Sequence, residues 1–232
     1  MTRPGGDLTL PDGPPPAASG GALLLPRGYA GSGTLEIKRS VFRAEIARVD
    51  DEEAARTVIA GARRAHADAR HHCSAFVLDV DGAQPVERSS DDGEPAGTGG
   101  MPILAALHGS GLVDVVCVVT RWFGGVKLGA GPLARAYGDA AGLALTQAPR
   151  IERVLRPRWR IHVSYADVGR LVDDLTTRGL TVEPEYGADA SLLVTAIAGT
   201  DVRELVASVT QGAAAVETAG TVAMESPVPD RA

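Results

Sequence analysis

A glycine-rich segment flanked by cations is the part of this sequence best suited to chemistry. Four glycines between residues 121 and 131 let the backbone approach a ligand closely, and the arginine and lysine side chains around them attract phosphates. The neighbouring Trp122 and Phe123 either stack on bases or belong to the core. We therefore predict an anion- or nucleic-acid-binding surface that contains Arg121, Gly124, Gly125, Lys127, Gly129, Gly131 and Arg135.

A second loop, over residues 89–100, is rich in glycine and acidic. Its carboxylates could hold a divalent cation, although the spacing is not that of an EF-hand. Its glycines could instead present backbone N–H groups to an anion, and a third reading is a solvated turn. We take Asp91, Asp92, Glu94, Gly97 and Thr98 as candidate residues of this acidic loop and assign it no resident metal.

The run Arg70-His71-His72-Cys73 brings possible zinc ligands together. Neighbours on a strand point to opposite faces, however, so all three cannot share one site, and no second ligand pair with zinc spacing follows. We keep Arg70 and His71 as candidates for contact with an anion or for proton transfer. The common nucleophile and metalloprotease motifs are absent, so we assign no catalytic residue and no cofactor.

Hydrophobic periodicity supplies the elements that position these loops. It predicts strands over residues 34–38, 41–49, 73–80 and 113–120. It also predicts a helix capped by Asp50 with Glu53, a helix that begins at Pro102 and a helix that begins at Pro132. Residues 113–120 form a continuous apolar run, which predicts a strand covered on both faces.

The C-terminal part has a clearer pattern. Strands are expected over residues 158–164, 180–186, 191–198 and 215–224, with helices over 167–178 and from Asp201 to Gly212. This order is that of a ferredoxin-like βαββαβ domain. Residues 148–157 are expected to form a connector. Residues 1–30 hold six glycines and six prolines, which predicts a disordered leader.

Composition bounds the function further. The 232 residues carry 23 basic and 29 acidic groups, a net charge of −6, so binding to nucleic acid would need a local patch. Only two of the basic residues, Lys38 and Lys127, are lysines. No segment is long and apolar enough to span a membrane, and the two cysteines are too few for a disulfide scaffold. We expect a cytoplasmic protein; the oligomeric state is left open.

Four motifs, in order, resemble the YigZ/IMPACT family: residues 70–73, 90–98, 118–125 and 127–137. Here Gly99 stands where the family usually has alanine, and Pro132 where it often has glycine. The resemblance covers about residues 31–226. It implies an α+β protein with two domains: residues 31–150, similar to domain IV of elongation factor G, and a ferredoxin-like domain over 157–226. Eukaryotic relatives act in translational control by countering a starvation-responsive initiation-factor kinase.

Three functions remain open at this point. The first is a non-catalytic, translation-associated regulatory protein that binds RNA, the ribosome or a translation factor through the candidate cations. The second is a protein-interaction regulator that does not bind nucleic acid. The third is a metal-dependent enzyme acting on a phosphorylated small molecule, with the acidic loop holding the metal and a histidine moving a proton.

Overall fold

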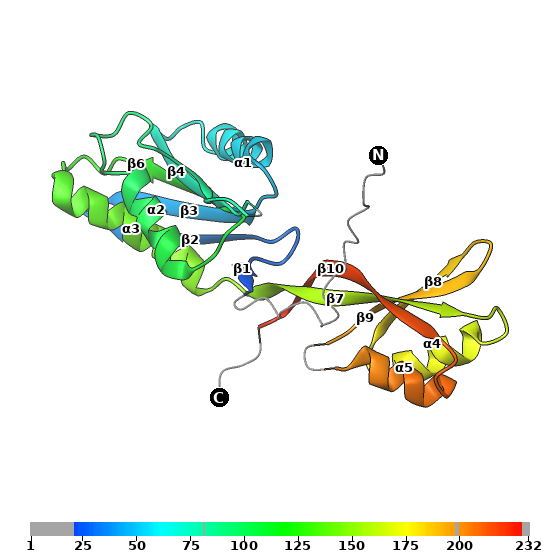
Figure 1. Ribbon diagram of the computed structural model, residues 1–232. Helices are drawn as coiled ribbons and strands as arrows, with labels where there is room; N and C mark the ends of the chain where they lie inside the picture. Colours follow the sequence, from blue (N-terminus) through cyan, green and yellow to red (C-terminus); the bar gives the residue numbers. More distant parts are fainter. Residues whose placement is uncertain (1–20, 81, 198–199, 229–232) are drawn as a thin grey trace, which may run out of the picture. The chain divides into compact units, whose positions relative to one another are not determined.

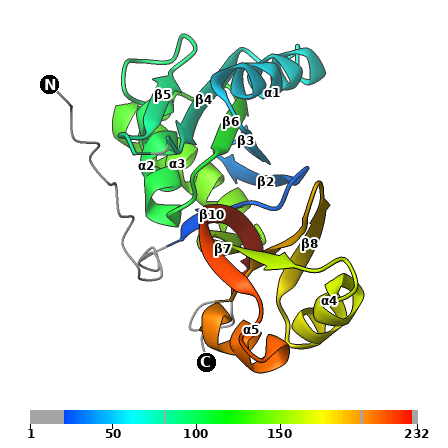
Figure 2. The ribbon, with the colours of Figure 1, turned by 45° about the vertical axis from the view of Figure 1, so that its right-hand side comes forward.

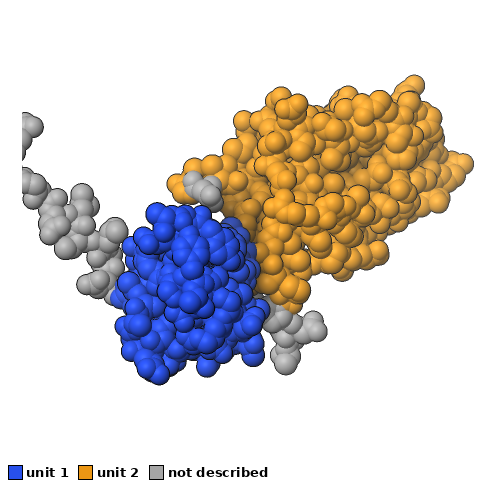
Figure 3. Space-filling model, turned by 90° about the vertical axis from the view of Figure 1, so that its right-hand side faces the viewer, with its two compact units in different colours: residues 1–21, 154–224 blue, residues 22–153, 225–232 orange. Residues whose placement is uncertain are grey.

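The chain forms two compact units, each with its own sheet and core. The computed structural model describes residues 21–80, 82–197 and 200–228. The N-terminal unit, orange in Figure 3, holds Ala22–Arg153 together with the end of the last strand from Glu225, and the C-terminal unit, blue, holds Val154–Met224. Both units combine helices with an antiparallel sheet, which confirms the α+β, two-domain class.

The N-terminal sheet has five strands in the order β2-β3-β6-β4-β5, with helices on both faces (Figure 1). The strands are β2 (Ala30–Ile37), β3 (Ser40–Arg48), β4 (His71–Leu78), β5 (Val86–Ser90) and β6 (Val115–Trp122). The helices are α1 (Glu52–Ala65), α2 (Gly100–Ser110) and α3 (Ala130–Thr146). A short strand, β1 (Ala22–Leu24), pairs outside this sheet with β7 (Ile151–Val163).

The central strand β6 is covered on both faces, as the sequence predicts. Its alternate residues Cys117 and Val119 pack in the core under α2 and α3, and Val116 and Val118 pack on the other face with residues of α1. This burial explains the continuous apolar run, because neither face of the strand is exposed to solvent and both therefore carry apolar residues. The strand lies two residues further along the chain than expected and extends from Val115 through Arg121 to Trp122.

The strand register places several loops at one end of this sheet. Val41 at the start of β3 pairs with Trp122 at the end of β6, and His71 at the start of β4 pairs with Arg121. The β2–β3 turn, the end of α1, the acidic loop and the glycine-rich loop all connect here, and α2 and α3 begin here. Because exposed lysine and arginine side chains gather here, we call it the cationic end of the sheet.

The C-terminal unit has the ferredoxin-like topology. Its strand order is β10-β7-β9-β8, and two helices pack on the apolar face of the sheet (Figure 2). The remaining elements are α4 (Val168–Thr177), β8 (Thr181–Tyr186), β9 (Ala190–Thr195), α5 (Val202–Thr210) and β10 (Ala215–Pro227). Asp201 caps α5 by accepting from the N–H groups of Arg203 and Glu204, as predicted.

Several boundaries predicted from sequence were wrong. Asp51, not Asp50, caps α1, and accepts from the N–H of Ala54 at 2.7 Å. The helices predicted to begin at Pro102 and Pro132 begin two residues earlier, at Gly100 and Ala130. Both prolines still lie in the first turn, where backbone N–H groups have no partner within the helix.

The predictions for the leader and the connector also need correction. Residues 1–20 lie outside the described residues, but β1 and the start of β2 fall within the predicted leader, and Leu24 and Leu25 are fully buried. Two adjacent buried leucines are enough to anchor a segment that is otherwise rich in glycine and proline. The predicted connector at residues 151–157 is the first half of β7, which continues without a break to Val163.

Candidate functional site

The acidic loop turns its carboxylates inward to bind the protein's own groups. Asp91 accepts hydrogen bonds at 2.8–2.9 Å from the backbone N–H groups of Gly97, Gly99 and Gly100, at the start of α2. Burial acts to raise the pKa of Asp91, but these three donors outweigh it and lower the pKa. The sequence suggested that these glycines present their N–H groups to a bound anion. The structure corrects this, because the anion is the side chain of Asp91.

The side chain of Asp92 likewise accepts hydrogen bonds from the protein's own groups. Its Oδ1 accepts from Arg63 at 2.6 Å, and its Oδ2 accepts from the backbone N–H of His72 at 2.7 Å. The backbone carbonyl of Asp92 lies 2.9 Å from Nδ1 of His71. His71 is therefore a loop anchor at the start of β4, and not a free group at a surface.

Glu94 forms a buried ion pair with Arg121. The Arg121 guanidinium donates to Oε1 of Glu94 at 2.6 Å, and the side chains are only 7% and 5% exposed. Tyr137 donates to the same oxygen at 2.8 Å. The guanidinium also lies over the rings of Phe42 and Phe123, at 5.3 and 5.6 Å. Arg121, expected to contact a ligand at the surface, is largely a structural cation.

The acidic and glycine-rich loops meet at a cavity of about 340 Å³ beside the N-terminus of α3. Gly129 begins this helix with φ of +83° and has no side-chain cap. Lys127 lines the cavity and is exposed, and Phe123 is 53% exposed beside it. The complete lining is Glu94, Pro95, Arg121, Phe123, Lys127, Leu128, Gly129, Ala130 and Leu133.

The sequence left open whether Trp122 and Phe123 stack on bases or belong to the core, and the structure places the two side chains differently. Trp122 is half-buried, and its indole N–H donates to Asp68 at 2.8 Å. Phe123 is exposed and lines the cavity, and because the Arg121 guanidinium lies over its ring, at most one ring face is open to stack on a base or another flat group. Thr98, the last residue of the acidic loop, is buried, and its hydroxyl donates to the carbonyl of Pro95.

The other predicted glycines shape the loop. A Cβ on Gly124 would lie 2.1 Å from the carbonyl carbon of Arg39, so only glycine allows this contact with the β2–β3 turn. Gly125 has φ of +87°, a conformation that glycine adopts without strain. Gly131, in the first turn of α3, has open space around it.

Exposed cations gather at this end of the sheet. Within the described part of the chain, six of them make no ion pair: Lys38, Arg39, Arg64, Arg70, Lys127 and Arg135. Adjacent strands lie about 4.8 Å apart, so the distance from the β2–β3 turn to the start of β4 is about 15 Å. Two exposed acids, Glu36 and Asp68, lie among them. The predicted Arg70, Lys127 and Arg135 are thus joined by three cations that the sequence analysis did not select.

The opposite end of the sheet carries acidic residues. Asp50, Asp51 and Glu52 lie where β3 gives way to α1, and Asp79 and Asp114 lie at the end of β4 and just before β6. Residues 31–150 contain 13 basic and 15 acidic groups. The acidic loop also lies at the cationic end, but Asp92 and Glu94 pair there with arginines and Asp91 binds backbone N–H groups. The six unpaired cations therefore favour a local positive potential on a unit whose net charge is negative.

Two buried thiols stand apart from this surface. Burial raises the pKa of both Cys73 and Cys117 to about 12, so neither forms a thiolate readily near neutral pH. Cys73 donates to the backbone carbonyl of Asp91 at 3.0 Å. In the described residues, no group of three histidine, cysteine or carboxylate side chains has the arrangement to hold a metal ion.

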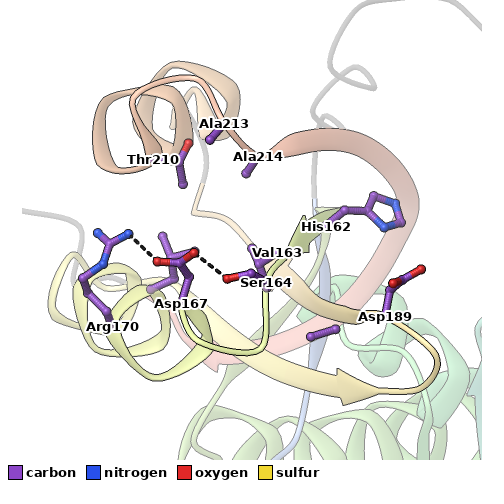
Figure 4. Close-up of a pocket in the computed structure, with 11 residues that line it drawn as sticks. His162, Val163, Ser164, Asp167, Arg170, Asp189, Thr210, Ala213 and Ala214 are labelled. Atoms are coloured by element: carbon purple, nitrogen blue, oxygen red, sulfur yellow. Dashed lines mark hydrogen bonds and ion pairs between the residues drawn. The ribbon is translucent and has the colours of Figure 1, made fainter.

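The C-terminal unit has a larger cavity, of about 440 Å³, between the start of α4 and the end of α5 (Figure 4). Three of its polar side chains bind each other: Ser164 donates to Asp167 at 2.6 Å, and Arg170 donates to the same carboxylate at 3.1 Å. Arg170 also donates to the carbonyl of Val209. We therefore place the candidate site at the cationic end of the N-terminal sheet.

Comparison with known proteins gives consistent relatives. The Impact N-terminal domain model matches residues 38–145. YigZ of Escherichia coli strain K12, an IMPACT family member, is 46% identical over 112 residues, which are 48% of this chain and 55% of that protein. An IMPACT family member of Thermus thermophilus is 41% identical over 150 residues, 65% of this chain and 79% of that protein.

A solved structure of a hypothetical protein aligns with a TM-score of 0.58 and 32% identity, over 85% of this chain and 97% of that one. The match to YigZ spans little more than half of that relative's length. In the described residues, no helix has the length and apolar character needed to cross a bilayer.

Proposed function

This chain belongs to the IMPACT family, and we propose that it is a non-catalytic, translation-associated regulatory protein that binds RNA through the cationic end of its N-terminal sheet. The observation that carries the proposal is the group of six exposed cations without acidic partners, beside an exposed Phe123 and an uncapped helix N-terminus. Such groups bind phosphates by charge and bases by stacking. The family resemblance, through its eukaryotic relatives, directs the proposal to translation.

The chemistry of the loops favours binding over catalysis. The three carboxylates of the acidic loop already hold backbone N–H groups or arginines, and His71 holds the carbonyl of Asp92. A metal-dependent hydrolase needs several of these groups free to bind the ion and to move protons. The six exposed, unpaired cations make no comparable hydrogen bonds or ion pairs within the described residues.

The test is binding of the full chain to fluorescently labelled single-stranded RNA and to ribosomes. The variant Arg70→Glu/Lys127→Glu reverses two unpaired cations and leaves the buried Arg121 intact. Its control, Arg150→Glu/Arg178→Glu, makes the same change in net charge at two exposed arginines that pair with no described residue, one beyond the end of α3 and the other at the end of α4 in the C-terminal unit.

We expect RNA affinity at about 50 mM salt to fall at least about tenfold in the first variant and to change less than about threefold in the control. Six cations at most contact phosphates, so the slope of log K against log salt should not exceed about 4 in magnitude for a single strand. Saturable binding that both variants weaken equally would reject this site. Absence of RNA and ribosome binding in the wild type would favour a protein partner instead.

A further inference from the structure

The turn between β2 and β3 has an unusual sequence for its backbone. Ile37 pairs with Ser40, so Lys38 and Arg39 are the two central residues of a tight hairpin. Their φ angles are +48° and +64°. A two-residue hairpin turn with positive φ at both positions favours Asn-Gly, because long side chains are strained in the left-handed region.

The glycine-rich loop holds this turn in place. Gly124 packs directly against the Arg39 backbone, and its N–H donates to the hydroxyl of the buried Ser40 at 3.0 Å. Strained backbone persists where the surrounding structure determines it, as it does here. The contact also brings Lys38 next to the loop that carries Lys127, and these are the chain's two lysines.

The other non-glycine residues with positive φ have structural roles. Among the described residues there are three: Asp92, Asp114 and Gln211. Asp92 binds Arg63 and the His72 N–H, Asp114 binds Arg153 and the Asp79 N–H, and Gln211 ends α5.

Lys38 and Arg39 have no comparable role. Both side chains are exposed, and neither makes a hydrogen bond or ion pair within the described part of the chain. Glu36, the nearest acidic residue in the sequence, is likewise without a partner there. No side-chain contact of Lys38 or Arg39 in the described residues therefore offsets the strain at these two positions.

We propose that the Lys38-Arg39 turn is a phosphate-binding element for RNA, in which two cations on a rigid, strained backbone face the ligand together with Lys127. The inference rests on the proposed function and names a part of the same site that the motifs did not indicate. A rigid turn presents its charges with less loss of conformational entropy than a flexible loop, which favours binding.

The decisive variant is Lys38→Asn/Arg39→Gly, which introduces the residue pair that this turn favours. We expect its melting temperature to equal or exceed that of the wild type. We also expect its affinity for single-stranded RNA at about 50 mM salt to fall about tenfold or more, and the salt slope to decrease by about 1.4 for two lost contacts. Lys38→Gln/Arg39→Gln, which removes charge and keeps long side chains, should lose the same affinity without gaining stability.

The control is Arg150→Gln/Arg178→Gln, which removes two charges elsewhere and should change affinity less than about threefold. If both turn variants keep wild-type affinity while Arg70→Glu/Lys127→Glu loses it, the turn is not a binding element and the proposed function stands. If the wild type does not bind RNA, both proposals are wrong. A marked loss of stability in the Asn-Gly variant would contradict the argument from strain.

Discussion

Arginine serves two purposes in this molecule, since some arginines pair with a neighbouring acid and others are exposed without an ion pair in the described residues. On the C-terminal sheet, the face away from α4 and α5 carries Arg158 and Arg160, which alternate along β7 with buried Trp159 and Ile161. Arg158 pairs with Glu183 at 2.6 Å, and Arg160 pairs with Glu185 at 3.2 Å. At the cationic end of the N-terminal sheet, Arg63 pairs with Asp92, but the other six exposed cations have no such partners in the described chain.

The difference shows that net charge is a poor guide to a binding surface. Both sequence regions carry more acids than bases, 15 against 13 in residues 31–150 and 12 against 8 in residues 151–232. What differs is whether each cation has an acid beside it. Exposed pairs contribute little to stability, about 0.2–1 kcal/mol each, but they neutralise the charge that a phosphate would meet.

The largest effect on stability should come from breaking the buried ion pair between Arg121 and Glu94 at the cationic end. Glu94→Gln leaves the Arg121 guanidinium, 7% exposed, without its counter-charge. Removing one partner of a buried pair costs about 3–5 kcal/mol, and we expect a loss of at least about 3 kcal/mol in the free energy of unfolding. Urea denaturation of the wild type and the variant measures this loss in the free energy of unfolding.

The matched variant on the C-terminal sheet is Glu183→Gln, whose side chain is 61% exposed in its pair with Arg158. It should cost less than about 1 kcal/mol. Equal costs for the two variants would mean that the Glu94–Arg121 pair is not desolvated as the structure indicates, and that Arg121 is as available to a ligand as its exposed neighbours.

Asp91→Asn should have a smaller effect on the free energy of unfolding, and this effect should depend on pH. An amide can replace two of the three hydrogen bonds that the carboxylate accepts, but its NH₂ group opposes the third N–H. We expect a loss of about 1–3 kcal/mol at neutral pH. Because the folded-state pKa of Asp91 is lowered, its contribution is complete above the unfolded-state pKa of about 3.9 and is lost as pH falls through the folded-state value.

The stability difference between wild type and Asp91→Asn should therefore be constant from about pH 7 to pH 5 and shrink below about pH 4. Asp139→Asn is the control, since Asp139 is exposed on α3 and has no partner among the described residues; it should change little at any pH. A difference that persists undiminished at low pH would contradict the role of the charged carboxylate.

Local patterns predicted the elements well, and the site only in part. The apolar run at 113–120 and the cap at Asp201 follow from periodicity and capping chemistry within a few residues. The inward turn of Asp91 and Glu94 depends on partners far along the chain, such as Tyr137, which no local pattern identifies. The strand pattern did not select Lys38 and Arg39, because it placed Lys38 at the end of the strand predicted over 34–38, whereas β2 ends at Ile37 and the turn that follows depends on contact with Gly124.

The smallest expected effect tests the comparison between the two sheets most directly. Glu183→Gln/Glu185→Gln removes the carboxylates nearest to Arg158 and Arg160 and leaves Arg160 only the longer, 3.9 Å pair with Glu217, so these arginines become more available to phosphate. We expect single-stranded RNA to bind about two- to fivefold more tightly at about 50 mM salt. The control Asp173→Asn/Asp174→Asn makes the same change in net charge at acids that pair with no described residue, and should produce a smaller gain. Equal gains would mean that overall charge, and not pairing, governs where RNA binds.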